Sequence, residues 1–304
     1  MQIESLALVR PPTTGDQDLA SRLSKGLADA SLSVALYSSS EFLCVLSAED
    51  LGSTTLLVVS PRQCIEASGD EPEFLSQVAC AQKRILASVG RVGSPGYMGR
   101  LNRGISFDAI LDVGFASQGD RHSEVSDVPY HFVFNGLTRE EEPVAEEPAH
   151  PAGRSIPWVL VGPKSDRNRD LLGELLECEI DPAGFCFLHA RMRSKTTAEL
   201  ILGTQRLPAV LSKARFYLWG VDRDGEYYES FRFIDPLLAG MVPCKIDPGL
   251  AAEGLDIPGV YPSVQAFQAE AEAEGYLAMY RRARDFYVSG GRLADQLSGA
   301  LGLV

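Results

Sequence analysis

The sequence predicts an α/β protein with two Rossmann-like βαβ domains that face a cleft. Short apolar, β-branched segments alternate along the chain with amphipathic segments, which is the pattern of parallel strands joined by crossover helices. Near the middle of the 304 residues the composition becomes acidic and proline-rich, and the same alternation resumes afterwards. Each half then has a common domain size of roughly 150 residues. The cleft between two such domains is the usual place for a ligand.

Residues 1–136 form the first predicted domain. Residues 54–60 are a nearly continuous apolar run, typical of a strand that a parallel sheet buries on both faces. Three leucines recur at helical spacing within residues 16–30, which predicts an amphipathic helix there. The expected strands are 3–9, 33–37, 54–60, 84–90, 107–115 and 130–135, and a second helix is expected over 74–81.

An interdomain linker is expected at residues 137–156 and a second domain at residues 157–304. The linker combines glutamate runs with prolines and has no apolar period, so it cannot bury enough surface to fold alone and is expected to be exposed. The expected strands of the second domain are 157–162, 184–189, 215–220 and 242–246. The expected helices are 165–177, capped by Ser165 or Asp166, then 197–202, 207–214, 263–268, 275–288 and a last one near Leu293.

The bulk properties exclude several classes of protein. A net charge of −13 argues against binding nucleic acid without regard to sequence, because such binding needs a basic face to displace counterions. The N-terminus lacks the basic and apolar regions of a signal peptide, and no apolar segment approaches the roughly 18 residues that span a bilayer. We therefore expect a cytoplasmic protein without a transmembrane segment. The cysteines form no CxxC pair and are expected to be free core thiols, and the histidines lack the spacing of metal ligands.

The stretch 226–245 predicts a ligand site. It follows the expected strand 215–220 and comprises an acidic and aromatic loop, a short helix opened by Asp235-Pro236, and a second strand. Proline loses no hydrogen bond in a first helical turn, and a carboxylate there lies at the positive end of the helix dipole. Gly240 fits the end of this helix, where a left-handed conformation is common. Ligands bind where such loops leave the carboxyl ends of strands.

Residues 232–243, Arg-Phe-Ile-Asp-Pro-Leu-Leu-Ala-Gly-Met-Val-Pro, resemble the C-terminal signature of GT-B glycosyltransferases, especially the exostosin-like and spore-maturation-type branches. Asp235 stands at the position of the family's acidic residue and Gly240 at that of its glycine. Residues 157–172 look like the start of the family's donor domain, and residues 128–135 like the end of its acceptor domain. The glutamate pair of the retaining members, eight residues apart, is absent, because its first position falls on Tyr227.

The resemblance implies a site for a nucleoside-diphosphate sugar in the second domain. Basic side chains and helix N-termini would bind the diphosphate, since arginine can hold a phosphate with two hydrogen bonds. Asp235 would hold the ribose hydroxyls, with Glu229 as the alternative, and Trp219 or the pair Tyr227-Tyr228 would stack on the base. The expected donor-binding residues are Gly162, Lys164, Arg167, Arg169, His189, Arg191, Lys195, Tyr228, Glu229, Arg232 and Asp235, with Arg193 in the same basic cluster.

A catalytic base would come from the first domain if the enzyme inverts the anomeric centre. It must take the proton of the acceptor hydroxyl from within hydrogen-bond reach. Asp16 and His131 are the principal candidates, with Asp112 and His122 beside them. Asp16 follows a strand and a glycine and opens a helix, a position that also suits an ordinary N-cap.

The leading interpretation is a metal-independent glycosyltransferase that moves a sugar from a nucleoside diphosphate to an acceptor hydroxyl on a glycan, a protein or a small molecule. It needs no cofactor, because the basic cluster and helix ends can stabilise the leaving diphosphate. The alternatives are a catalytically inactive GT-B-like binding or scaffold protein, another double-Rossmann sugar-nucleotide enzyme such as an epimerase, and a two-domain receptor for a small ligand.

Overall fold

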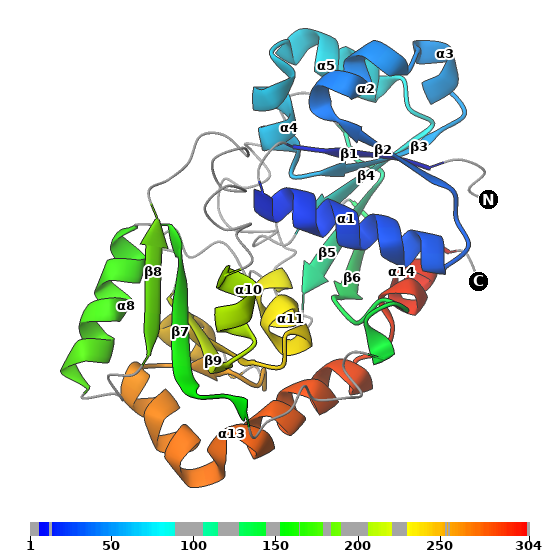
Figure 1. The fold of residues 1–304 in the computed structure, drawn as a ribbon. Helices are drawn as coiled ribbons and strands as arrows, with labels where there is room; N and C mark the ends of the chain where they lie inside the picture. Colours follow the sequence, from blue (N-terminus) through cyan, green and yellow to red (C-terminus); the bar gives the residue numbers. More distant parts are fainter. Residues whose placement is uncertain are drawn as a thin grey trace. The chain divides into compact units, whose positions relative to one another are not determined.

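The computed structural model describes two compact units, and the chain passes between them more than once (Figure 1). Unit 1 comprises Met1–Glu140, Glu226–Phe231 and Gly290–Val304, and unit 2 comprises Glu141–Gly225 and Arg232–Ser289. The described residues are 6–11, 14–88, 106–114, 128–143, 153–163, 165–178, 184–189, 206–220, 230–252, 254 and 256–302. This division differs from the expected domains, because residues 290–304 belong with the first unit and not with the second.

Unit 1 contains a parallel sheet whose described strands number six, in the order β2-β1-β3-β4-β5-β6. The strands are β1 (Leu6–Arg10), β2 (Val34–Ser38), β3 (Thr55–Val59), β4 (Lys83–Ser88), β5 (Ala109–Gly114) and β6 (Tyr130–Phe134). Every pairing is parallel. The strands expected from the sequence are confirmed to within a few residues, because their apolar, β-branched runs carry the signal of buried parallel strands.

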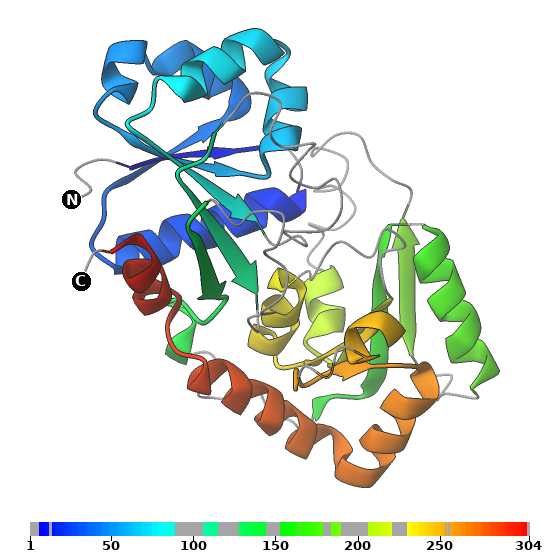
Figure 2. The ribbon, with the colours of Figure 1, turned by 180° about the vertical axis from the view of Figure 1, so that it is seen from behind.

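Helices cover both faces of this sheet (Figures 1 and 2). On one face lie α1 (Thr14–Asp29) and α14 (Leu293–Leu301), which share an apolar core with the strands. On the other face lie α2 (Ser39–Val45), α3 (Ala48–Leu51), α4 (Pro61–Ser68) and α5 (Glu71–Ala79). We expected only the last of these four. The first three are short, and a helix of one or two turns shows too few apolar repeats to stand out.

The last helix, α14, packs against α1 of the same unit. A Cβ atom on Gly26 of α1 would lie 2.8 Å from Leu293 Cγ and 2.9 Å from Leu297 Cδ1, so the two helices approach closely only because residue 26 is glycine. The backbone N–H of Leu293 also donates to the carbonyl of Leu137 at 3.1 Å. The end of the chain therefore completes the core of the unit that its beginning builds.

Unit 2 contains a second parallel sheet, whose described strands number five in the order β11-β10-β9-β7-β8. The strands are β7 (Ile156–Pro163), β8 (Phe185–His189), β9 (Ala214–Gly220), β10 (Val242–Ile246) and β11 (Val260–Tyr261). The helices are α8 (Asp166–Glu177), α10 (Arg206–Leu211), α11 (Phe231–Leu238), α12 (Pro248–Ala252) and α13 (Val264–Ser289). The helix expected over 197–202 lies outside the described residues.

Most described residues of the expected linker are exposed or half-buried, as predicted, but three residues are buried. Leu137 and Thr138 are buried beside α14. Arg154 is 2% exposed, and its guanidinium donates to the carbonyls of Ala214 and Ala239 and, at 3.4 Å, to that of Leu211. Because arginine carries five donors in one plane, a single side chain can bind carbonyls at the ends of α10 and α11 and the start of β9. The composition of the segment did not predict the burial of Arg154, because composition gives the average polarity of a segment and not the contacts of a single arginine.

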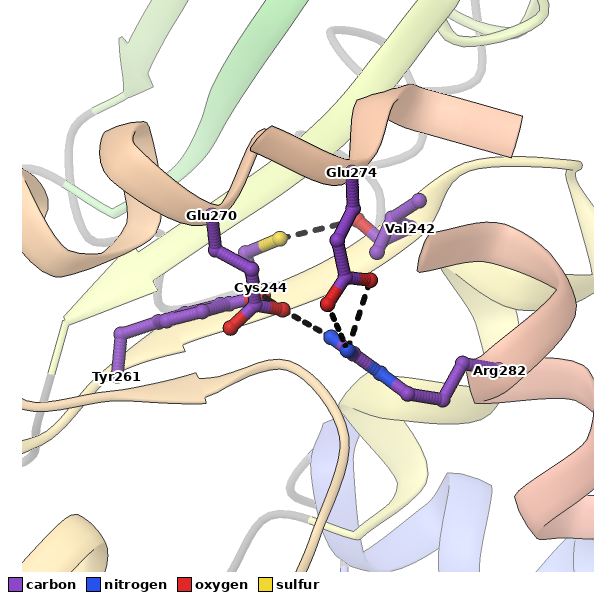
Figure 3. A network of polar contacts seen from close by, with 6 residues as sticks. All are labelled: Val242, Cys244, Tyr261, Glu270, Glu274 and Arg282. Atoms are coloured by element: carbon purple, nitrogen blue, oxygen red, sulfur yellow. Dashed lines mark hydrogen bonds and ion pairs between the residues drawn. The ribbon is translucent and has the colours of Figure 1, made fainter. Parts of the chain in front are cut away.

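Helix α13 changes direction at Gly275, which has the non-helical angles φ 76° and ψ 158°. Arg282, beyond the kink, forms ion pairs with Glu270 and Glu274, which precede it (Figure 3). Glu270 also accepts a hydrogen bond from Tyr261 Oη at 3.0 Å. Burial is the main cause that raises the pKa of Tyr261, and the Glu270 carboxylate adds to it. The interruption at Gly275 agrees with the two helices that the sequence predicts on either side of it.

Replacing Gly275 by alanine is expected to lower the free energy of unfolding by about 1–3 kcal/mol, because its backbone angles are almost restricted to glycine. No atom lies within 4 Å of the added Cβ, so the loss measures backbone strain alone. Gly173→Ala in α8 is the matched control: its site is equally open and its φ is not positive, so alanine should be neutral or stabilising by about 0.5–1 kcal/mol. Urea denaturation followed by circular dichroism separates the two variants, and equal destabilisation would contradict the prediction.

Candidate functional site in unit 2

The direction of chain winding reverses in unit 2 between β7 and β9. Strand β8 lies on one side of β7 and β9 on the other, so the order of the strands reverses at this point of the sheet. In open parallel sheets this reversal opens a crevice at the carboxyl ends of the two strands, and ligands bind there. The candidate site therefore begins where β7 ends at Gly162-Pro163 and β9 ends at Gly220.

Both strand ends lie against the first turns of α8. A Cβ on Gly162 would lie 2.7 Å from Asn168 Nδ2, and a Cβ on Gly220 would lie 3.4 Å from the carbonyl oxygen of Arg167. Any larger residue at Gly162 would push the buried Asn168 side chain aside. The two glycines thus allow the N-terminus of α8 to approach the carboxyl edge at the point of reversal.

The N-terminus of α8 is built as the sequence predicts. Ser165 is the N-cap, and its Oγ accepts a hydrogen bond from the backbone N–H of Asn168 at 3.5 Å. The first backbone N–H groups of a helix have no intrahelical acceptor, and together with the helix dipole they attract anions. This end of α8 can therefore contribute to the binding of a phosphate or a carboxylate.

The basic residues expected beside this site are placed only in part. Arg167 is half-buried in the first turn of α8. Arg169 is exposed, and its guanidinium forms an ion pair with Asp166 one turn earlier. Lys164, Arg191, Arg193 and Lys195 lie outside the described residues. Arg167 is thus the placed cation closest along the chain to the Gly162 strand end.

The structure corrects the expected position of Asp235. Helix α11 begins at Phe231, so Asp235 is its fifth residue and is exposed, and Pro236 lies inside the helix instead of opening it. The helix starts earlier because Phe233, Ile234 and Leu237 form a continuous buried face. A carboxylate at this position gains little from the helix dipole, which acts on the first and last turns.

The end of α11 at Gly240 is confirmed. Gly240 has φ 77°, its N–H donates to the carbonyl of Leu237 at 2.9 Å, and the N–H of Met241 donates to that of Pro236 at 2.8 Å. Tyr276 Oη donates to the carbonyl of Gly240 at 2.6 Å and Tyr280 Oη to that of Leu237 at 3.1 Å. Helix α11 is therefore fixed at its C-terminal end.

Arg232 lies in the first turn of α11 and is half-buried. Trp219 is 1% exposed and packs edge-on against Phe233, with 4.7 Å between the ring centroids. It is a core residue and its faces are not free to stack on a base. Of the other expected contacts, Tyr227, Tyr228 and Glu229 lie outside the described residues. His189 ends the edge strand β8, and only its backbone is described.

Sequence reasoning missed a buried ion pair at the carboxyl end of β10. Lys245 is 1% exposed, and its Nζ lies 2.9 Å from Asp247 Oδ2. Asp247 Oδ1 accepts a hydrogen bond from the N–H of Leu250 at 3.0 Å and so caps α12. Lys245 is paired in register with Trp219, which places both on the face of the sheet covered by α11. Two features of the sequence could have indicated this pair. A lysine stands inside an apolar strand, and two residues later an aspartate precedes a proline, which is the pattern of a helix N-cap.

Of the candidate catalytic bases of unit 1, the two whose side chains are described, Asp112 and His131, lie on opposite faces of the sheet. Asp112 is buried on β5 and accepts a hydrogen bond from Tyr130 Oη. His131 is the second residue of β6, near the amino end of that strand, and alternation along the strand places it on the opposite face of the sheet from Tyr130. Asp16 is the third residue of α1 rather than its N-cap, and only its backbone is described. His122 lies outside the described residues.

A chain of buried polar side chains follows the carboxyl end of β6. Arg22 donates through Nε to Asn135 Oδ1 at 3.2 Å and through Nη2 to the carbonyl of Gly136 at 2.8 Å. Asn135 Nδ2 donates in turn to Ser230 Oγ at 3.0 Å. Asn135 and Ser230 have no exposed surface. Ser230 is thereby fixed within unit 1, immediately before α11.

Fold and sites together define a doubly wound α/β protein with two parallel sheets, each with its own point of reversal. No protein-family model matches the chain, and no curated protein matches it. Within the ranges given above, no helix is long and apolar enough to cross a membrane. The same ranges contain no group of three or more His, Cys, Asp or Glu side chains placed to hold a metal ion.

Proposed function

We propose that the protein is a metal-independent glycosyltransferase of the GT-B type, which transfers a sugar from a nucleoside-diphosphate donor to an acceptor hydroxyl. The observation that carries the proposal is the reversal point of unit 2, where Gly162 and Gly220 let the Ser165-capped end of α8 approach the ends of β7 and β9. Two units with doubly wound parallel sheets are what the resemblance of residues 157–172 and 232–243 implies.

The chemistry of a diphosphate suits this edge of the sheet. A diphosphate needs cations or converging N–H groups, and the first turn of α8 offers backbone donors together with Arg167. Because the same groups stabilise the charge of the leaving nucleoside diphosphate, the transfer requires no metal ion. Asp235 is the proposed contact to the ribose hydroxyls, now as an exposed side chain in the middle of α11.

The test is a titration of the full-length protein with UDP, GDP, TDP and CDP, followed by thermal unfolding. A nucleotide that binds the folded protein raises its stability by mass action, so one of the four should raise the melting temperature in a concentration-dependent way. Arg167→Gln is expected to weaken that nucleotide at least about tenfold, because it removes charge-assisted hydrogen bonds. Arg281→Gln, an exposed arginine on α13, is the matched control and should bind as the wild type does.

Each result decides a different part of the proposal. A folded protein that responds to none of the four nucleotides rules out the glycosyltransferase. Normal nucleotide affinity in Asp235→Ala removes the ribose assignment alone. Nucleotide binding without hydrolysis or transfer of any sugar favours the catalytically inactive binding protein.

A further inference from the structure

Helix α13 of unit 2 consists of two segments, residues 264–274 and 276–289, which meet at Gly275 (Figure 1). Every residue from 268 to 278 is exposed or half-buried, and we call this stretch the elbow. Buried apolar residues of the same helix lie beyond the elbow on either side. Because the elbow adds little to the apolar core, its polar contacts decide how firmly the two segments are held at their angle.

The first segment carries an unfavourable arrangement of charge. Its C-terminal end contains Glu270, Glu272 and Glu274, and the whole segment contains no lysine or arginine. Carboxylates near the C-terminal end of a helix meet the negative end of its dipole, and like charges four residues apart repel each other. A cation from outside the segment therefore stabilises this end.

Arg282 of the second segment supplies that cation (Figure 3). Its guanidinium pairs with Glu270, and its Nη1 lies 2.7 Å and 2.8 Å from the two carboxylate oxygens of Glu274. Glu270 and Arg282 are 12 residues apart along the chain, and a straight helix would separate them by about 18 Å along its axis. The ion pair with Glu270 therefore forms only while α13 is bent.

The two segments of α13 contact different helices of unit 2. In the first segment, Gln265 hydrogen-bonds the side chain of Cys178 at the end of α8. In the elbow, Tyr276 Oη donates to the carbonyl of Gly240 at the end of α11, at 2.6 Å. The angle at Gly275 therefore affects where the end of α11 lies relative to α8.

We propose that Arg282 is an electrostatic latch, which holds α13 bent at Gly275 and makes the bend, with the attached end of α11, sensitive to ionic strength. The side chains of Arg282, Glu270 and Glu274 are between 31% and 41% exposed, so dissolved ions reach them and weaken the latch. Its release frees the elbow and loosens the contact of Tyr276 with α11. The latch does not rest on the proposed glycosyl transfer and works equally in an inactive binding protein.

Hydrogen exchange of the full-length protein, measured by mass spectrometry at two salt concentrations, tests the latch. The Debye length falls from about 30 Å in 0.01 M salt to about 3 Å in 1 M salt. In the wild type, the elbow should exchange about fivefold faster at the higher concentration, because two partly exposed ion pairs are screened. Arg282→Gln should exchange at the faster rate in both, and residues 239–241 at the end of α11 should exchange faster with it. Arg282→Lys keeps the charge and should retain most of the salt response.

Arg281→Gln is the matched control, because it removes the same charge from the adjacent, exposed position of α13. It should exchange as the wild type does at both salt concentrations. The proposal is overturned if Arg281→Gln and Arg282→Gln respond alike, or if Arg282→Gln keeps the full salt response of the wild type. Faster exchange confined to the elbow overturns the effect on α11. If Arg282→Gln does not fold, Glu274→Gln decides: because Glu274 provides one of the ion pairs, an unchanged salt response in that variant also overturns the latch.

Discussion

Replacing Lys245 by methionine is expected to lower the free energy of unfolding by about 3–5 kcal/mol, the cost of leaving a buried charge without its partner. Lys245 Nζ lies 2.9 Å from Asp247 Oδ2, with the lysine 1% exposed. Methionine fills a similar volume, so the change removes the charge and leaves little cavity. Urea denaturation monitored by circular dichroism gives the difference in free energy.

The double variant Lys245→Met/Asp247→Asn separates the cost of an unpaired charge from the loss of packing. It buries no charge, and asparagine can still cap α12 by accepting the N–H of Leu250. The double variant should therefore be clearly more stable than Lys245→Met alone. If Lys245→Met lowers the free energy of unfolding by less than about 1 kcal/mol, the pair is not buried as described. The same conclusion follows if the double variant loses as much stability as Lys245→Met.

Replacing Leu297 by alanine should cost about 2–5 kcal/mol, the range for a large aliphatic side chain removed from a packed core. Leu297 of α14 has no exposed surface and belongs to the core formed by α1 and the first sheet. Leu277→Ala on α13, where the side chain is 41% exposed, is the control and should change stability by no more than about 0.5 kcal/mol.

The Leu297→Ala variant also tests whether the C-terminal residues 290–304 pack with unit 1 or with unit 2. Hydrogen exchange measured by mass spectrometry should become faster in α1 when Leu297 is alanine, because the two helices share one core. Exchange in α8 of unit 2 should stay close to that of the wild type. Faster exchange confined to unit 2 would instead support a second domain that runs to residue 304.

The strands and the caps were predictable because their signals are local. The run of residues 56–59 within β3 is apolar on both faces, which is typical of a buried parallel strand. Ser165 before α8 and Gly240 after α11 satisfy requirements of a helix end that depend on the neighbouring few residues. Asp235 was misplaced for the complementary reason: Asp-Pro is a common helix start, but buried apolar residues before it extended the helix.

The sequence predicted where the candidate site lies, at the ends of two strands, but it did not predict which side chains contact one another there. Alternation of strands and helices predicts a parallel sheet, and strand ends predict where ligands bind, which points to Gly162 and Gly220. The reversal between β7 and β9 follows from the order of strands in space, which periodicity does not report. The burial of Arg22, Arg154 and Lys245 could not be predicted either. The sequence does not show whether a charged side chain is solvated by water or paired with a buried partner.

The sequence by itself determined the α/β class, the positions of the strands and the helix ends at Ser165 and Gly240, since local spacing and composition control each of them. Tertiary structure alone decided that α14 completes unit 1, that Asp235 lies inside α11 and that Lys245 is buried beside Asp247. Each of these depends on contacts between segments far apart along the chain, whose free energy arises only when the packed core brings them together.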